Sequence, residues 1–424
     1  MNGSRDKVRS ALNHRNTGSV PVDFGATAVT GIHCCIVEAL RNYYGLEPRP
    51  VKIVDAFQML GEVDAELAEK IGVDCIGIGG PKDIFDLDVT RMREQTTPWG
   101  QLVLVPEAMD LTPDAQGDVY VYAGGDKSYP PSAVMPKGCY FINAIERQYP
   151  IDEEQLNPED NVEEFGLLTE GDLAYYRSET DKAYQTGRAV VASFGGTALG
   201  DVAFVPGMGL KQPKGIRSVV EWYMSTAMRQ DYLHQVFEKE IDIAIANYEK
   251  LWAALGDKIE VVLTCGTDFG SQESQFCSID TFRELWLPHY RRMNDWIHQH
   301  TTWKIFKHSC GAIIPILPGL IEAGFDIINP VQINAKDMDS RRLKEEFGSR
   351  LTFWGGGVDT QKILPFGTPD EIRRHVKEQC EILGRDGGFV FNAVHNIQAN
   401  VPVENVVAMF DALKDFRCGP FEGL

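Results

Sequence analysis

Short apolar runs alternate along the chain with longer stretches in which apolar residues recur at helical spacing, a pattern typical of βαβ units around a parallel sheet. Eight runs are predicted strands: 20–24, 73–78, 189–194, 259–264, 303–307, 326–329, 351–354 and 389–391. Predicted helices cover 53–70, 218–255, 278–300, 313–323 and 369–383. Eight strands alternating with helices predict an α/β fold of the TIM (β/α)8 barrel type, with an open, doubly wound sheet as the alternative.

The spacing of the runs also predicts an insertion. A TIM barrel needs only about 250 residues, whereas the chain has 424. The widest gap lies between the second and third runs, at about 80–187. Its alternating stretches (101–105, 119–123 and 139–142) and its acidic segment 152–172 predict a β-rich insertion, capped by an acidic helical region, over one mouth of the barrel. Because no repeat or linker is evident, residues 1–424 are predicted to form one domain.

The amino-acid composition excludes several classes of protein function. Hydrophobic residues make up 43% and charged residues 24%, which is typical of a globular protein. The net charge of −20 would repel nucleic acid and anionic membranes. The N-terminus lacks a signal-peptide pattern, and no run of about 18 apolar residues could span a bilayer. We therefore expect a cytoplasmic protein whose nine cysteines are reduced, with the adjacent Cys34 and Cys35 as buried thiols.

The strongest chemical signal ends the fifth run. His308 and Cys310, two residues apart on an extended strand, project to the same face and can chelate one ion, while Gly311 lets the backbone turn away. His395 leaves the eighth run at the matching end, and Gln332 follows the sixth. These residues predict a zinc site with three protein ligands and an open fourth position. The structural alternative is that Cys310 fills the core and that His308 is a buried imidazole whose hydrogen bonds are satisfied within the protein.

Other polar residues are predicted at the same rim. Asp23 ends the first run, Asp74 and Cys75 lie in the second, Thr197 follows the third, and Asp268 follows the fourth. Each of these residue types is also common in helix caps and turns.

Three motifs together resemble the uroporphyrinogen decarboxylase-like superfamily. They are His308-Ser309-Cys310-Gly311, Asn329-Pro330-Val331-Gln332 and Asn392-x-x-His395-Asn396-Ile397, followed by Pro402-x-Glu404-Asn405. The resemblance extends from Val20 to the C-terminus and implies a TIM barrel. The superfamily contains cofactor-free porphyrinogen decarboxylases and zinc-dependent methyltransferases that exchange methyl groups with a corrinoid protein.

The His-x-Cys pair looks like the zinc ligands of the methyltransferase branch. In that branch a cysteine usually supplies the third ligand, whereas this chain has His395. The decarboxylase branch carries an Arg-Gln-Ala-Gly-Arg segment after its first strand, but residues 23–31 contain no arginine to bind the porphyrin carboxylates. The resemblance therefore implies a zinc-dependent, corrinoid-dependent methyltransferase.

The resemblance also implies roles for the rim residues. His308, Cys310 and His395 would bind zinc, with Gln332 beside them or in the fourth position. Asp268 and Asp23 would orient the substrate or accept a proton, and Gln332, Asn392 and Thr197 would contact the substrate. The family also implies a homodimer.

Two imidazoles and one thiolate leave the zinc complex more positive than a His-Cys-Cys set, which favours activation of a poor leaving oxygen and hence an O-methyl substrate. Two alternatives stay open. One is a metal-free decarboxylase with Asp268 and His395 as acid and base. The other is a non-catalytic barrel that binds a small ligand.

Overall fold

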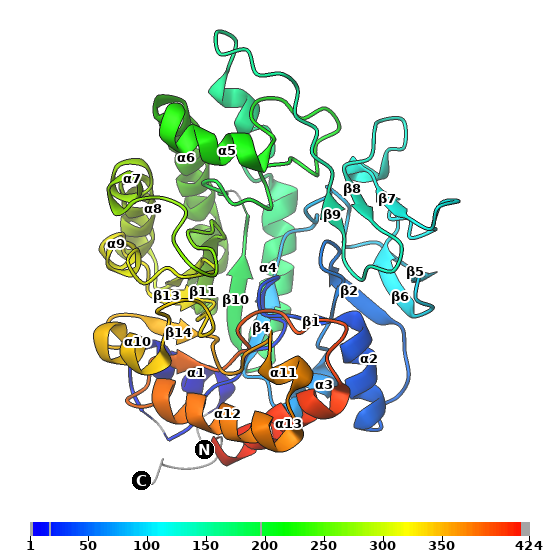
Figure 1. Cartoon of the computed structure of the whole chain (residues 1–424), viewed down its shortest axis with the longest axis vertical. Coiled ribbons are helices and arrows are strands. Elements are labelled where there is room, and N and C mark those ends of the chain that lie inside the picture. Colours follow the sequence, from blue (N-terminus) through cyan, green and yellow to red (C-terminus); the bar gives the residue numbers. More distant parts are fainter. Residues whose placement is uncertain (1–2, 17, 196, 417–424) are drawn as a thin grey trace.

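The computed structural model describes residues 3–16, 18–195 and 197–416, and a curled, fully parallel sheet organises them (Figure 1). Among these residues the sheet has seven strands in the order β15-β14-β13-β12-β11-β10-β4. Their bounds are β4 Cys75–Ile78, β10 Ala189–Ser193, β11 Val261–Cys265, β12 Lys304–His308, β13 Ile327–Asn329, β14 Thr352–Trp354 and β15 Phe389–Val390. Seven of the eight predicted runs are therefore confirmed as strands of one barrel-like sheet.

The first predicted run, 20–24, occupies the gap between the two edges of this sheet. Val22 forms an isolated parallel bridge with Phe391, just after β15. On the other side the Asp74 N–H, just before β4, donates to the Val22 carbonyl at 2.7 Å. The run is thus a bridge and not a full strand, because Pro21 has no N–H to donate and the chain turns away at Gly25 with a φ of 95°.

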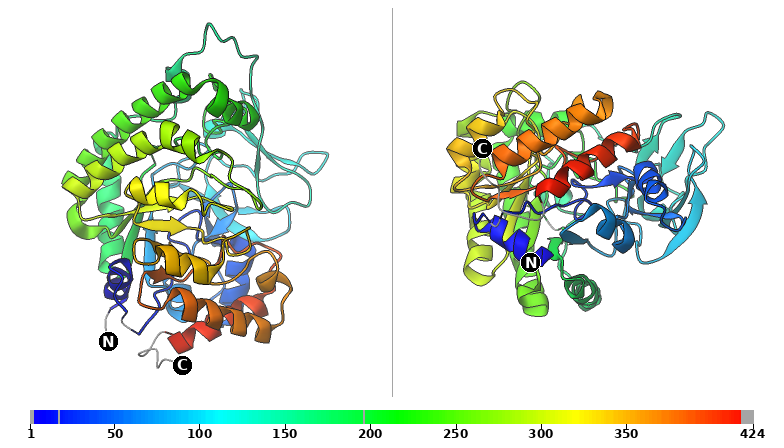
Figure 2. Two further views of the ribbon diagram at one scale, coloured as in Figure 1. Left: turned by 60° about the vertical axis from the view of Figure 1, so that its left-hand side comes forward. Right: turned by 90° about the horizontal axis from the view of Figure 1, so that it is seen from below.

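Helices cover the outside of the sheet (Figures 1 and 2). Their bounds are α4 Glu170–Gln185, α5 Val219–Met228, α6 Gln230–Leu255, α7 Ile279–Leu285, α8 Leu287–His300, α9 Leu317–Glu322, α10 Ser340–Phe347, α11 Ile363–Phe366, α12 Pro369–Leu383 and α13 Val403–Leu413. Helix α12 shows why such boundaries can be predicted. Thr368 and Glu371 form a capping box, and Pro369 occupies the first helical position.

Helix α1 (Ser4–Leu12) closes the end of the barrel at which the strands begin (Figure 2). Val8, Ala11 and Leu12 are buried among inward-facing strand residues that include Val191 and Phe306. Arg9 adds an ion pair of 2.8 Å to the buried Glu260, which precedes β11. The barrel interior is therefore filled with apolar side chains at this end, and the buried carboxylates of Asp74 and Glu260 there are paired with residues of α1.

Two smaller sheets lie beside the barrel, on the right in Figure 1. One has the order β1-β3-β2-β6-β5 and the other β7-β8-β9. The bounds are β1 Ile32–His33, β2 Val51–Asp55, β3 Leu60–Gly61, β5 Met92–Thr96, β6 Leu102–Pro106, β7 Val119–Val121, β8 Ala133–Met135 and β9 Asn143–Ala144, with helices α2 Cys34–Tyr43 and α3 Ala65–Ile71. Five strands therefore lie within 92–144, and residues 32–61 supply three more that the predicted insertion did not include.

Two expectations about secondary structure are wrong. Residues 53–70 are not one helix, because the β-branched run 51–54 pairs as β2 and Asp64 caps the short helix α3. The acidic segment 152–172 is largely irregular, since it holds only a 3-10 turn at Pro158–Asn161 and the start of α4.

The rim position predicted for Asp74 is also wrong. Asp74 precedes β4, at the end of the barrel where the strands begin, and it accepts the Ser4 hydroxyl at 2.6 Å.

None of the helices among the described residues combines the length and apolar character that crossing a membrane requires. The single domain over 1–424 stays a prediction, and its residues 1–2, 17, 196 and 417–424 lie outside the described residues.

Candidate functional site

The predicted ligand pair lies where β12 ends. His308 is the last residue of the strand and, like Phe306, projects into the barrel. Cys310 follows two residues later, with its Sγ 3.4 Å from His308 Nε2. Gly311 then turns the backbone with a φ of 92°, and a Cβ there would lie 2.2 Å from a Gly270 backbone atom. Only glycine fits this turn, so the glycine of the motif sets the direction of the chain after Cys310.

A buried asparagine orients His308. Asn329, the last residue of β13, donates from its Nδ2 to the Trp354 carbonyl at 2.8 Å, so its Oδ1 is free to accept. His308 Nδ1 lies 2.6 Å from that Oδ1 and therefore carries the proton. The Nε2 lone pair consequently faces Cys310 and the barrel mouth. This is the arrangement of a metal-binding histidine, whose other N–H is held by an oxygen acceptor.

Asp268 lies beside the pair. Its Oδ1 accepts the Cys310 backbone N–H at 2.6 Å and lies 3.9 Å from His308 Nε2. Burial and the Asp268 carboxylate raise the pKa of the Cys310 thiol, whereas burial lowers the pKa of His308 to about 4. The imidazole is therefore neutral near pH 7, which is the form that binds metals, while the thiol keeps its proton until a cation replaces it.

His395 completes the cluster. The ligand atoms of His308, Cys310 and His395 lie within 4.8 Å of one another, and the two imidazole rings meet edge to face with centroids 5.4 Å apart. Burial, followed by the charge of His308, lowers the pKa of His395 to about 3. The sequence prediction that residues after β12 and β15 converge agrees with this placement.

The tautomer of His395 differs from that of His308. The Asn396 N–H donates to His395 Nδ1 at 2.8 Å, so the neutral ring carries its proton on Nε2. His308 and Cys310 thus fit a zinc ion as they stand. His395 fits as a third ligand through Nε2 when its proton moves to Nδ1 and the Asn396 contact opens.

The other predicted site residues make mainly structural contacts. Gln332 Oε1 accepts the Gly311 N–H at 2.7 Å and so holds the turn after Cys310. Asn392 donates to the Asp23 carbonyl at 2.7 Å, and its own Oδ1 is buried without a hydrogen-bond partner. Thr197 Oγ1 donates to the Thr264 carbonyl and is buried. Asn392 therefore keeps a buried polar atom without a partner, and Gln332 uses only its Oε1, in the hydrogen bond from Gly311.

Asp23 is fully buried and is held by two donors. Its Oδ2 accepts the Trp354 indole N–H at 2.9 Å and its Oδ1 accepts the Ala26 N–H at 3.2 Å. Burial raises its pKa to about 6. Trp354 connects Asp23 to Asn329 and so to His308, which makes Asp23 part of the network behind the ligand pair.

Two polar residues near the site were not predicted. Lys307 is fully buried on the outer side of β12, and its Nζ donates to the carbonyls of Thr267 and His308, both at 2.7 Å. It thereby joins the loop that carries Asp268 to the strand that carries His308. Asp201, whose pKa burial raises to about 6, lies close enough to Asp268 for their charges to interact. Neither residue belongs to a recognisable motif, so only the fold reveals them.

Comparison with known proteins supports the resemblance inferred from the motifs. Residues 214–416 match the family model of uroporphyrinogen decarboxylase (URO-D), a segment that holds all three predicted zinc ligands. No curated protein matches the chain.

Among solved structures, a methyltransferase from Methanosarcina mazei is similar with a TM-score of 0.56 and 16% identity, covering 98% of this chain and 99% of that one. At this identity the likeness shows the fold alone. The Ignisphaera aggregans GH53 catalytic domain (TM-score 0.32, 13% identity, 92% and 99% covered) and the β-glycosidase of Thermosphaera aggregans (0.37, 11%, 83% and 86%) are too distant in structure to support an argument.

Proposed function

We propose that the chain is a zinc-dependent methyltransferase that exchanges a methyl group between a small methylated substrate and a corrinoid protein, because residues 214–416 match the family model of uroporphyrinogen decarboxylase. One observation carries the proposal. His308 Nε2 directs its lone pair at Cys310 Sγ, 3.4 Å away, at the carboxyl ends of the strands, where barrel enzymes keep their chemistry. The similarity of the fold to a methyltransferase is consistent with it.

His308 and Cys310 would hold the ion, with His395 as the third ligand. Zinc bound there would act as a Lewis acid on a substrate thiol or on a methoxyl oxygen. Asn329 keeps the His308 proton on Nδ1, and Gln332 holds the turn after Cys310. Asp268, which contacts the Cys310 backbone, would orient the substrate or accept its proton at the mouth.

The ligand set bears on the substrate class. Two neutral imidazoles and one thiolate give a complex one charge unit more positive than one imidazole and two thiolates. A more positive ion polarises a weakly basic oxygen more strongly, so we propose an O-methyl compound as the methyl donor. Cobalt(I) of the corrinoid protein would take the methyl group, and the oxygen would leave with the electron pair of its bond to carbon.

Metal content tests the proposal first. We expect His308→Ala and Cys310→Ser each to contain about one equivalent of zinc less than wild type by elemental mass spectrometry, and to lose methyl transfer from methoxylated substrates to reduced corrinoid protein. Cys380→Ser is the control, because Cys380 is a buried thiol on α12 that does not belong to the group formed by His308, Cys310 and His395. Unchanged zinc content and turnover in Cys310→Ser would exclude the mechanism.

The tautomer of His395 favours a second candidate, a metal-free decarboxylase. With its proton on Nε2, His395 could donate to a substrate while Asp268 accepts. This function predicts wild-type turnover in protein stripped of metal by a chelator, whereas the methyltransferase predicts loss of turnover and its recovery on adding zinc.

A further inference from the structure

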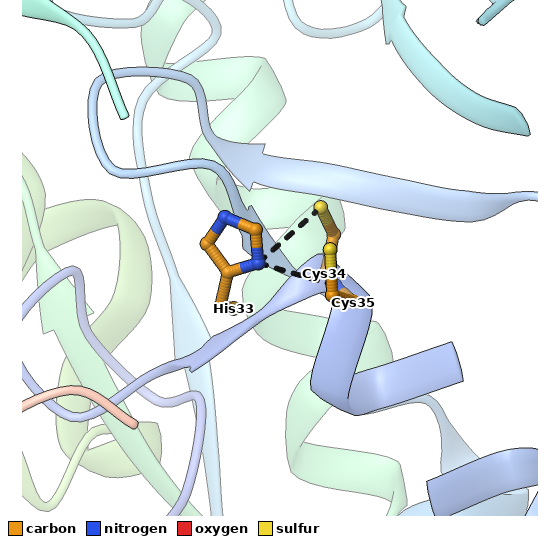
Figure 3. Close-up of side chains that lie close together, drawn as sticks. All are labelled: His33, Cys34 and Cys35. Atoms are coloured by element: carbon orange, nitrogen blue, oxygen red, sulfur yellow. Dashed lines mark hydrogen bonds between the residues drawn. The ribbon is translucent and has the colours of Figure 1, made fainter. Parts of the chain in front are cut away.

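A second group of metal-binding side chains lies at the start of α2, outside the barrel mouth (Figure 3). His33 ends β1, and Cys34 and Cys35 are the first two residues of the helix. One ring nitrogen of His33 and the two Sγ atoms lie within 4.8 Å of one another. Nδ1 lies 3.8 Å from Cys34 Sγ, and both sulfur atoms lie on the Nδ1 side of the ring (Figure 3).

The orientation of His33 is an independent indication of a ligand. His33 Nε2 lies 2.9 Å from the Tyr140 carbonyl, which can only accept, so Nε2 carries the proton. The Nδ1 lone pair consequently faces the two thiols. A backbone carbonyl that holds the remote N–H is the usual support of a metal-binding histidine.

A helix cap explains only part of this arrangement. Nδ1 also accepts the Cys35 N–H at 3.2 Å, as the side chain of an N-cap residue does. Serine, threonine, aspartate or asparagine would serve that purpose better, and none of them needs a neighbouring thiol. The cap therefore leaves the convergence of two sulfur atoms on the imidazole unexplained.

The surroundings hold the group in place. Gln101 is buried, donates to the Cys34 carbonyl at 3.0 Å, and has its Oε1 3.4 Å from Cys35 Sγ. The rings of Trp99 and Tyr140 lie 5.7 and 5.9 Å from the His33 ring, measured between centroids. Trp99 and Gln101 lie between β5 and β6, and Tyr140 lies just before β9. The ligands therefore lie where several segments of the two smaller sheets meet.

We propose that His33, Cys34 and Cys35 form a second zinc site, distinct from the barrel mouth. Zinc–sulfur bonds of about 2.3 Å and zinc–nitrogen bonds of about 2.0 Å in a tetrahedron place ligand atoms about 3.5–3.8 Å apart.

The three ligands are consecutive residues, so the ion would fix the junction of β1 and α2. Gln101, which precedes β6, and Tyr140, which precedes β9, contact this junction. Zinc would therefore stabilise the local structure that these two segments pack against and leave the chemistry at the barrel mouth unchanged.

The test uses the full chain in a Cys310→Ser background, which removes the barrel-mouth ligand and so separates this proposal from the proposed function. After chelator treatment under reducing conditions, Zn²⁺ alone is titrated against a chromophoric competitor. We expect one equivalent to bind and to raise the unfolding temperature. Adding Cys35→Ser or His33→Asn should abolish both effects. Asparagine still caps the helix, so His33→Asn separates loss of metal from loss of fold.

Cys139→Ser is the matched control, because Cys139 is a half-buried free thiol next to Tyr140 but outside the group. It should leave the equivalent in place. Co²⁺ in place of zinc should give a sulfur-to-cobalt charge-transfer band that disappears with Cys35→Ser. Failure of the Cys310→Ser protein to bind zinc, or binding that survives Cys35→Ser, would overturn the proposal.

Discussion

Asn329 illustrates how single residues set the chemistry of the barrel mouth. Its amide donates to one strand and accepts from His308 on another, and so it selects the nitrogen that faces Cys310. The His-x-Cys spacing could be read from the sequence because both residues belong to one strand. The tautomers could not, because they depend on Asn329 for His308 and on a backbone N–H for His395. The role of Lys307 could not be predicted for the same reason, because the fold determines which carbonyl groups its Nζ contacts.

Replacement of Asn329 should weaken zinc binding without removing a ligand. In Asn329→Leu the His308 ring loses its acceptor, and we expect zinc affinity to fall about 10–100-fold. Asn329→Asp keeps an acceptor and should retain most of the affinity. Competition with a chromophoric chelator measures the effect, in a Cys35→Ser background so that only the barrel mouth binds. Equal affinities of the Leu and Asp variants would show that the contact does not orient His308.

His395 has two candidate roles that one pair of variants separates. As a ligand, it should be replaceable by cysteine, so His395→Cys should keep zinc while His395→Ala should lose more than tenfold in affinity. As a proton donor only, it should leave zinc affinity unchanged in both variants while turnover is lost. The same chelator competition, run beside a methyl-transfer assay, gives both quantities.

At the scale of elements, strands with a strong local sequence pattern were predicted correctly, whereas segments with a weak pattern were assigned the wrong secondary structure. The seven strands of the barrel sheet are short β-branched or aromatic runs flanked by polar residues, and each could be recognised by itself. Residues 53–70 have helix-like spacing, but Ile53 pairs with Gly61 of the neighbouring strand β3. Val51, just before this range, pairs with Val103 of β6, which is distant along the chain. Such pairing is decided by partners that periodicity does not show. The packing of α6 against the loop after β10 could not be predicted from the sequence for the same reason.

That packing predicts a pH dependence. Glu240 on α6 is buried and accepts the N–H groups of Ala198 and Leu199 at 2.9 and 2.8 Å. Burial raises its pKa to about 8. The folded state therefore favours the protonated acid, so the stability that this group contributes is present below pH 4.5 and is lost as the pH rises through about 8.

Glu240→Gln keeps an oxygen acceptor and cannot ionise. Its unfolding temperature relative to wild type should therefore rise between pH 5 and about pH 8 and level off above that. Glu238→Gln, an exposed change on the same helix, should show no such trend. Thermal unfolding across that range measures both, and parallel curves for Glu240→Gln and wild type would contradict the prediction.

At the scale of the whole molecule, the strands around the barrel are not joined equally well. One side is a continuous parallel sheet, whereas the seam at Val22 is an isolated bridge with a few main-chain hydrogen bonds. Helix α1 compensates, because it contacts β4, β10 and β15 and so spans the seam from below. The overall α/β architecture could be predicted from counting strands, while this closure could not, since it joins residues about 370 positions apart.

Truncation of the α1 contact should therefore destabilise the whole fold. Leu12→Ala removes a buried side chain among the inward-facing strand residues, and we expect a loss of about 2–5 kcal/mol in the free energy of unfolding. Ser10→Ala on the same helix should change it by less than about 0.5 kcal/mol. Urea unfolding at equilibrium compares the two, and a similar small effect of both changes would show that α1 is not integral to the barrel.

Asn396 gives the site a consequence beyond metal binding. Its backbone contacts His395, while its side chain accepts the Gly31 N–H at 2.6 Å and donates to Ala28 and Gln58, each at 2.8 Å. Ala28 is exposed, so Asn396 links the surface of this loop to the residue that sets the tautomer of a buried imidazole. We expect a second protein that displaces this loop on binding to change the position of the proton on His395.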